Sequence, residues 1–277
     1  MSERLQRRFD LLARAGRPGL VPFAVAGDPD AATADLVFDA LRRRGGDLIE
    51  IGIPAREPAM DGPVIQRAHA RAAAAGAGSL DALTQAARLR GRDPDMPLVL
   101  MGYAAELRSA GPAPYLDALA NAGADGLLIV DADPPERIAW SQLARDRGVA
   151  FIQIVASDED ARSPPGPAWA RSGFVYCVAS DGPTGGTPPA VAALAGRAGT
   201  ARRVTGLPVV AGFGVRTPAM AMAVGGFADA VAVGTVAVDA LEQALAAGHS
   251  GRAAADGVGN VVARLAEGLA GARLTIR

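Results

Sequence analysis

The stretch "DLIEIGIPAREPAMDGP" (residues 47–63) starts as a short apolar run and continues as a loop that is rich in proline. An apolar run of this length with β-branched residues is typical of a strand buried on both faces, as in a parallel sheet. Glu50 lies inside the run, and burial of an unpaired carboxylate is costly. The stretch therefore predicts a core strand that carries a carboxylate where hydrophobic side chains are expected.

Seven further runs of this kind occur along the chain. They cover residues 20–27, 97–103, 126–131, 150–155, 174–179, 208–214 and 230–235. Segments of helical period separate them, as at 31–45 and 115–124. Eight strand–helix units in a chain of this length predict an α/β fold with a single (β/α)8 TIM barrel domain over residues 1–277. A doubly wound sheet is the competing topology, but the even repeat and the absence of GxGxxG after the first strand weigh against it.

The barrel would place Glu50 and two long loops at one end. Alternate residues of a barrel strand point inward, and the intervals after the second and sixth strands, 53–63 and 180–189, project from the C-terminal face. An inward-facing Glu50 lies near the catalytic mouth. Partial exclusion of water there would raise the pKa of a carboxyl group and suit it to general acid–base catalysis. The alternative is a structural ion pair with an arginine, although no strand arginine occurs nearby.

Asp61 is a second carboxylate, in the loop "MDGPVIQ" (60–66). Asp-Gly-Pro is a common turn sequence, so Asp61 could serve only to form a turn. Two carboxylates that converge on one mouth in different environments can nevertheless differ in pKa and in role. Glu50 and Asp61 are therefore the candidate catalytic pair.

A third feature is a set of glycines that follow the last three strands. "GFGV" (212–215) ends the seventh strand, Gly234-Thr235 leads the eighth into a helix, and "PTGG" (183–186) lies in the sixth loop. Backbone N–H groups of such loops, with a helix N-terminus, form the usual phosphate site of a barrel. Glycine at a strand end also serves tight turns, so only the joint position of the three motifs favours a phosphate site.

Composition narrows the class of protein. With 21% charged residues and a net charge of −1, the chain gives no electrostatic case for binding nucleic acid or an anionic membrane. The one cysteine, Cys177, excludes an intrachain disulfide, and two distant histidines, His69 and His249, disfavour a His/Cys metal site. The charged N-terminal helix lacks the apolar core of a signal peptide, and no apolar run reaches the ~20 residues of a membrane span. We expect a soluble cytoplasmic protein.

From "LVPFAVAGDPD" to "AVAVGTVAVDALE", nearly the whole chain resembles the tryptophan synthase alpha subunit, a family that includes free-standing indole-3-glycerol-phosphate lyases. The family pattern around its catalytic glutamate reads Glu-Leu-Gly-Ile-Pro-Phe-Ser-Asp-Pro-x-Ala-Asp-Gly-Pro-x-Ile-Gln. Here the matching stretch is "EIGIPAREPAMDGPVIQ" (50–66). The same spacing between the two carboxylates, followed by Gly-Pro-x-Ile-Gln, makes the match highly specific.

The resemblance implies a role for each matching residue. Glu50 corresponds to the general acid–base and Asp61 to the second catalytic carboxylate. The substrate-pocket matches are Phe23, Ile65, Tyr103, Tyr176, Thr184 and Phe213. The phosphate-cradle matches are Gly185, Gly214, Gly234 and Thr235, where threonine replaces the usual serine and keeps the hydroxyl.

The implied reaction is retro-aldol cleavage of indole-3-glycerol phosphate to indole and glyceraldehyde 3-phosphate. Glu50 delivers a proton to C3 of the indole and then removes one from the side-chain hydroxyl as the aldehyde forms. Asp61 accepts the indole N–H and stabilises the positive charge that develops on nitrogen. The phosphate anchor orients the reacting bond. This chemistry requires no metal or organic cofactor.

The departures from the family pattern cluster in loops. Residues 55–57 read Ala-Arg-Glu instead of Phe-Ser-Asp, Ala105 replaces an asparagine, and the sixth loop reads "ASDGPTG" (179–185). "DADPPE" (131–136) replaces a more usual Asp-x-Pro-x-Glu-Glu. In the family these loops contact the pyridoxal-phosphate β subunit, so a weakened or absent β-subunit partner is one prediction. Ordinary divergence of loops is the other interpretation.

Two different functions stay open from the residues. A regulatory alpha-like subunit could bind a partner without catalysis, although retention of both carboxylates and of the cradle argues against it. Another phosphate-binding barrel enzyme, an isomerase or aldolase, would explain the glycines but not the spacing of Glu50 and Asp61.

Overall fold

A computed structural model describes residues 2–108, 110–163, 171–178, 191–212 and 214–272. Its strands are β1 Gly19–Val25, β2 Ile49–Gly52, β3 Leu98–Gly102, β4 Gly126–Ile129, β5 Ala150–Phe151, β6 Gln153–Val155, β7 Val175–Val178, β8 Val209–Gly212 and β9 Ala230–Val233. Its helices are α1 Glu3–Ala15, α2 Ala31–Arg43, α3 Pro63–Ala74, α4 Ser79–Arg92, α5 Ala104–Arg108, α6 Pro112–Asn121, α7 Pro134–Asp146, α8 Asp158–Arg162, α9 Val191–Thr205, α10 Pro218–Gly225, α11 Thr235–Ala246 and α12 Gly251–Ala270.

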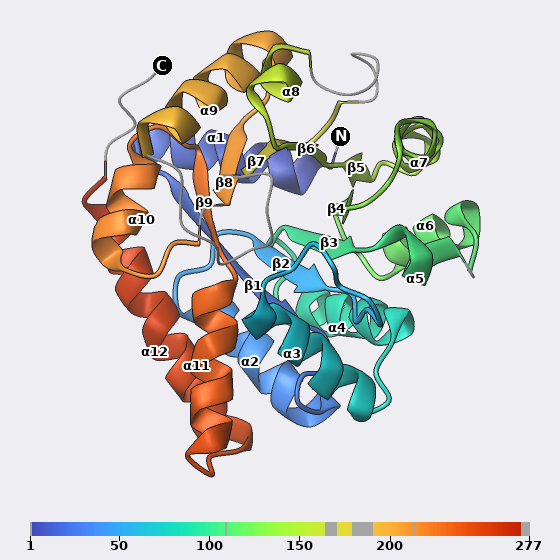
Figure 1. Cartoon of the computed structure of the whole chain (residues 1–277), viewed down its shortest axis with the longest axis vertical. Coiled ribbons are helices and arrows are strands. Elements are labelled where there is room, and N and C mark those ends of the chain that lie inside the picture. Colours follow the sequence, from blue (N-terminus) through green and yellow to red (C-terminus); the bar gives the residue numbers. More distant parts are fainter. Residues whose placement is uncertain (1, 109, 164–170, 179–190, 213, 273–277) are drawn as a thin grey trace.

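The strands form one parallel sheet in the order β5-β4-β3-β2-β1-β9-β8-β7-β6. At one end of this order β5 pairs with β4, and at the other end β6 pairs with β7. Because β5 and β6 belong to the single stretch 150–155, that stretch joins the two ends of the sheet. The helices surround the strands (Figure 1). The predicted (β/α)8 barrel is confirmed.

The predicted fifth strand is wrong in one respect, because it is interrupted at Ile152. The Ile152 N–H still donates to the Leu127 carbonyl at 2.9 Å, whereas the Phe151 N–H donates to the Ser172 hydroxyl at 3.0 Å. The stretch changes its neighbour from β4 to β7 at this point. A hydrophobic run predicts a strand but not a change of pairing partner within it.

Helix boundaries also differ slightly from the prediction. The helix expected over 115–124 is α6, which begins earlier, at Pro112, because proline at the first helical position has a suitable φ angle and no N–H to satisfy. The helix expected over 31–45 is α2, which ends at Arg43. Its N-terminus is capped by Asp30, whose side chain accepts the N–H groups of Ala32 and Thr33.

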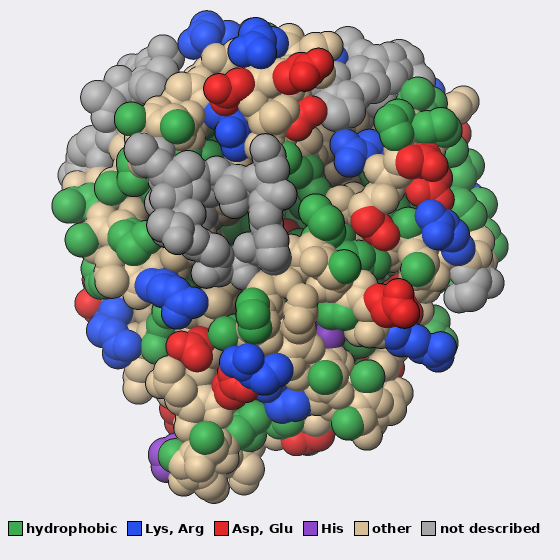
Figure 2. All heavy atoms as spheres, viewed as in Figure 1, with side chains coloured by type: hydrophobic (Ala, Val, Ile, Leu, Met, Phe, Trp, Pro, Cys, Tyr) green, Lys and Arg blue, Asp and Glu red, His purple; other side chains and the backbone are tan. Residues whose placement is uncertain are grey.

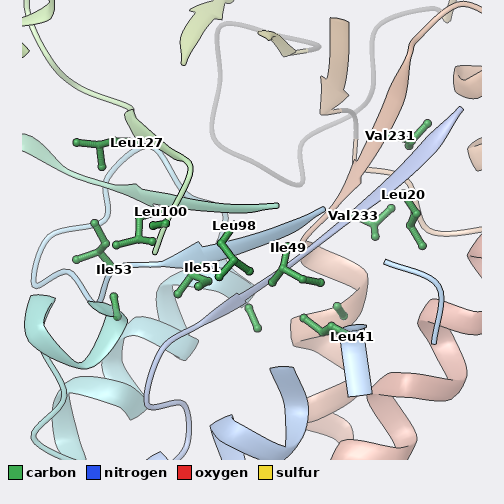
Figure 3. Packing of buried hydrophobic residues seen from close by; sticks show 14 of the residues in the cluster. Leu20, Leu41, Ile49, Ile51, Ile53, Leu98, Leu100, Leu127, Val231 and Val233 are labelled. Carbon is green, nitrogen blue, oxygen red and sulfur yellow. The ribbon is translucent and has the colours of Figure 1, made fainter. Parts of the chain in front are cut away.

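Two apolar layers lie on opposite faces of the barrel wall. The outer layer, between strands and helices, contains Ile49 and Ile51 of β2 with Leu98 and Leu100 of β3. Figure 3 shows this layer, with Ile49 and Ile51 on the same side of β2 and Leu41 of α2 close by. Leu48 belongs instead to the inner layer. Alternation along β2 therefore directs Glu50, which shares the parity of Leu48, into the barrel.

The inner layer continues into α1. Leu5, Phe9 and Leu12 of this helix pack against inward-facing residues of the barrel, and the rings of Phe9 and Phe174 lie 5.8 Å apart. Each buried side chain of this size contributes roughly 1.5–3 kcal/mol. Helix α1 thus fills the barrel at the end opposite the C-terminal loops.

Three aspartates just before strands hold this same N-terminal end together. Asp47, Asp125 and Asp229 each accept a backbone N–H of a neighbouring strand and pair with arginine. Arg4 of α1 also pairs with Asp125 at 2.8 Å, which fastens the helix to the barrel. The C-terminal end carries the long loops and the remaining buried carboxylates.

Candidate active site

Glu50 is enclosed by the barrel and is only 1% exposed. Its Oε1 atom has no hydrogen-bond partner, and no arginine pairs with it in the described part of the chain. Burial, followed by the nearby charge of Asp61, raises the pKa of Glu50 to about 8. The described residues provide no ion pair for Glu50, and its raised pKa favours the protonated carboxyl group near neutral pH.

Asp61 lies in the loop between β2 and α3 and is 3% exposed. The Tyr103 hydroxyl donates to Asp61 Oδ2 at 2.9 Å and accepts the Met60 N–H at 3.1 Å. Burial, together with the charge and hydrogen bond of Asp61, raises the pKa of Tyr103, so the phenol keeps the proton that it donates. The Gln66 side chain also donates to the Asp61 carbonyl at 2.8 Å. The loop thus holds Asp61 in one orientation.

His69 is a site residue that the sequence did not reveal as such. It lies on α3 with 3% exposure, and its Nε2 atom is 3.4 Å from Asp61 Oδ2. Its Nδ1 atom accepts the Ala55 N–H at 3.0 Å. In the sequence, His69 bears only on the question of a metal site, which its distance from His249 disfavours. The available signal was its spacing of four residues from Ile65, which puts both side chains on the same face of α3.

Two of the predicted apolar residues, Phe23 and Ile65, lie close together. Phe23 pairs in register with Glu50 across β1 and β2. Phe23 and Ile65 belong to one buried cluster, and both side chains approach Gly234, where a Cβ atom would lie 3.4 Å from Phe23 and 3.6 Å from Ile65. These residues form one apolar wall beside the first residues of α11.

Tyr176 forms a second wall. Its pKa is raised by burial and then by the charges of the nearby Glu50 and Asp61. Its ring packs over Gly212, where a Cβ atom would lie only 2.8 Å from the ring. Glycine is therefore required at the end of β8 for Tyr176 to keep this position.

The predicted phosphate cradle is partly described. Gly234 precedes α11 and Thr235 begins it, without a side-chain cap on the free N–H groups. Thr235 is 4% exposed, and its hydroxyl oxygen has no hydrogen-bond partner among the described residues. Gly214 follows β8 with a φ of 56°, a conformation that favours glycine. Free N–H groups at a helix N-terminus with an unpaired hydroxyl are suited to an anion. Thr184, Gly185 and Phe213 lie outside the described residues.

Other kinds of site are not built from the described residues. No group of three or more His, Cys, Asp or Glu side chains within them is placed to hold a metal ion. No helix among them is both long and apolar enough to cross a bilayer. Basic and acidic side chains are interspersed over the face shown in Figure 2 rather than gathered by sign.

Known proteins resemble this chain over most of its length. A family model described as the tryptophan synthase alpha chain matches residues 9–265. The chain belongs to the tryptophan synthase alpha chain family. A tryptophan synthase alpha chain of Granulibacter bethesdensis is 39% identical over 274 residues, which are 99% of each chain. One from Caulobacter sp. (strain K31) is 40% identical over 242 residues, 87% of this chain and 88% of the other.

Solved structures agree with this assignment. Tryptophan synthase subunit alpha from Legionella pneumophila superposes with a TM-score of 0.85 at 26% identity, over 98% of this chain and 99% of that one. A chain of Mycobacterium tuberculosis tryptophan synthase gives a TM-score of 0.84 at 28% identity, over 97% of this chain and 99% of that one. Alpha subunits of this family cleave indole-3-glycerol phosphate to indole and glyceraldehyde 3-phosphate and pair with a β subunit, so the chain is a lyase of that class.

Proposed function

We propose that Glu50 and Asp61 carry out the retro-aldol cleavage of indole-3-glycerol phosphate in this chain. The observation that supports this most strongly is the contrast between the two carboxyl groups. Glu50 has no described partner and a pKa raised to about 8, whereas Asp61 receives the Tyr103 hydroxyl at 2.9 Å. Two neighbouring carboxyl groups in unlike environments can take the acid and the charge-stabilising roles separately.

The reaction begins with proton transfer from Glu50 to C3 of the indole ring. Asp61 accepts the indole N–H and stabilises the positive charge that this transfer creates. The Glu50 carboxylate then takes the proton of the side-chain hydroxyl next to the ring. The bond from C3 to that carbon breaks, its electron pair returns to the indole ring, and an aldehyde forms on the departing glyceraldehyde 3-phosphate. Glu50 ends the cycle protonated.

The walls and the cradle orient the substrate for this chemistry. Phe23, Ile65 and Tyr176 present apolar surface for the indole ring beside Glu50. The start of α11, with the unpaired Thr235 hydroxyl, is the described part of the phosphate site. Gly214 supplies a turn beside it, and Thr184, Gly185 and Phe213 keep their proposed roles from the family resemblance. Anchoring the phosphate gives binding energy that holds the reacting bond near Glu50.

The test is a direct assay of the purified chain with indole-3-glycerol phosphate. Indole and glyceraldehyde 3-phosphate should appear in equal amounts, and Glu50→Gln should lose at least about a hundredfold in kcat. Binding of glycerol 3-phosphate should be nearly unchanged in that variant, because the cradle lies on other strands. Glu57→Gln, on the exposed part of the same loop, is the matched control. A Glu50→Gln enzyme with wild-type kcat removes Glu50 from the mechanism.

We also propose that this chain depends less on a β subunit than other members of its family. The Arg56 N–H donates to Glu106 Oε1 at 2.9 Å, which ties the loop after β2 to α5 after β3 in the isolated chain. A loop already ordered loses less entropy when the site closes. Arg56 and Ala105 lie on the surface, where they replace a hydroxyl and an amide of the family pattern, whereas Ala55 is buried.

A further inference from the structure

His69 is a buried histidine with a polar contact at each ring nitrogen. Nδ1 accepts the Ala55 N–H at 3.0 Å, so this nitrogen carries no proton. The ring proton is then on Nε2, which lies 3.4 Å from Asp61 Oδ2. We propose that His69 is a positioning residue of the reaction, whose Nε2–H holds the Asp61 carboxylate while its Nδ1 holds Ala55. The proposal builds on the role of Asp61 proposed above.

The contacts of Asp61 show what this positioning achieves. The Tyr103 hydroxyl donates to Oδ2, and the His69 Nε2 contact is made with the same oxygen. No contact to Oδ1 comes from the residues that the structure describes. The Tyr103 hydrogen bond and the His69 contact act on one oxygen, so together they restrict the plane of the carboxylate and leave the other oxygen for the indole N–H. The 3.4 Å separation exceeds an ideal N–H···O distance by about 0.5 Å, and such contacts commonly tighten when substrate binds.

The side chains around His69 hold its ring in one orientation. The edge of its ring approaches Tyr103, with ring centroids 6.5 Å apart. Arg71, which follows His69 on α3, forms two hydrogen bonds with Asp28 at 2.7 and 2.8 Å. Among the described residues, Tyr103 and Asp61 contact the ring and Asp28 interacts with it electrostatically. Because Nδ1 accepts the Ala55 N–H, Nε2 carries the ring proton and faces Asp61 as a donor.

The second contact of His69 extends its influence along the loop. Ala55 lies near the start of the segment between β2 and α3, and Asp61 lies near its end. The imidazole joins both points to α3. A variant that keeps only one of the two contacts can separate anchoring of the loop from orientation of the carboxylate.

Two amide variants make this separation. In His69→Gln the side-chain N–H reaches the place of Nε2 and can donate to Asp61, whereas in His69→Asn the oxygen reaches the place of Nδ1 and accepts from Ala55. We expect His69→Gln to keep kcat within about threefold. His69→Asn and His69→Phe should lose about tenfold or more in kcat, with KM and the Kd for inorganic phosphate within twofold of wild type. A tenfold loss corresponds to ~1.4 kcal/mol at the transition state.

The ring proton itself can be observed, independently of turnover. The chain has two histidines, so 15N NMR of histidine-labelled protein shows few signals, and His249→Gln identifies those of His69. We expect the Nε2–H tautomer, with an Nε2 signal that shifts in Asp61→Asn. Activity loss in His69→Gln equal to that in His69→Phe, wild-type kcat in His69→Asn, or an Nδ1–H tautomer would overturn the proposal. An inactive wild-type chain instead rejects the proposed reaction, and the NMR result still decides the geometry of His69.

Discussion

At the scale of single residues, Glu50 shows how burial sets the chemistry of a carboxyl group. The same side chain on the surface would be ionised at neutral pH, whereas here burial and Asp61 raise its pKa to about 8. This shift has a cost in stability, because the unfolded chain releases the proton that the folded chain retains. Folding stability due to Glu50 is therefore highest below pH 4.5 and declines as pH rises toward 8.

Glu50→Gln should therefore stabilise the protein in a pH-dependent manner. The glutamine amide has nearly the same volume and never becomes charged. The free energy of unfolding of the variant should therefore not fall as pH rises from 4.5 to 8. The free energy of unfolding of the variant should exceed that of wild type by an amount that grows to a few kcal/mol between pH 5 and 8 and stays constant above pH 8. Urea unfolding at several pH values measures it, with Glu57→Gln as the exposed control. A difference that does not change with pH would mean that Glu50 has an ordinary pKa in the folded protein.

Tyr176 and Gly212 provide a second prediction at this scale. A Cβ atom at residue 212 would lie 2.8 Å from the Tyr176 ring, so Gly212→Ala must displace the ring or the strand. Overpacking of this kind costs typically 1–3 kcal/mol. We expect a lower unfolding midpoint and a raised KM for indole-3-glycerol phosphate. Gly91→Ala on α4, where a Cβ meets no atom within 4 Å, is the control. Equal effects of the two substitutions would show that Tyr176 does not need its present position.

At the scale of elements, local patterns account for most of the barrel. Apolar runs such as 47–52 predict strands because both faces of a barrel wall are buried. Each strand must therefore be apolar along its own length, whichever strands lie beside it. The interruption at Ile152 depends on which strands are neighbours, which no local pattern contains. Glu50 was predictable because a carboxylate in an apolar run is anomalous. For His69 the sequence offers only the spacing from Ile65 on one helix face, because its contact with Ala55 forms only after the loop folds back.

Helix α1 tests how much the closed end of the barrel depends on one element. Phe9 is 6% exposed and packs on Phe174, so Phe9→Ala should destabilise the fold by about 3–5 kcal/mol. Because α1 lies at the end opposite the loops, kcat of the folded fraction should change less than twofold. Chemical unfolding and an activity assay at low temperature measure both. Leu11→Ala, which alters an exposed residue of the same helix, is the control. A large fall in kcat without loss of stability would mean that the two ends of the barrel are coupled.

At the scale of the whole molecule, we propose that residues 1–277 form one domain. The inner layer reaches from α1 to strands on all sides of the barrel, so no part has a core of its own among the described residues. The cytoplasmic location expected from the sequence stays a prediction.

The proposed independence from a β subunit also belongs to this scale. Indole release should rise less than about tenfold as a β subunit from the same genome is added, a coupling below ~1.4 kcal/mol. Glu106→Ala removes the acceptor of the Arg56 N–H and should lower the activity of the isolated chain while increasing the response to the β subunit. Strong activation of the unaltered chain would show that the partner still controls the loops.

Above all, we propose that Glu50 acts as a buried, protonated acid. Its most direct test is the pH dependence of single-turnover cleavage of indole-3-glycerol phosphate, measured for wild type and for Asp61→Asn. The wild-type rate should fall as pH rises through about 8, and the fall should occur at lower pH in Asp61→Asn, because the charge of Asp61 helps to raise the pKa of Glu50. A wild-type rate that is level across pH 8, or that increases with pH there, would contradict the account.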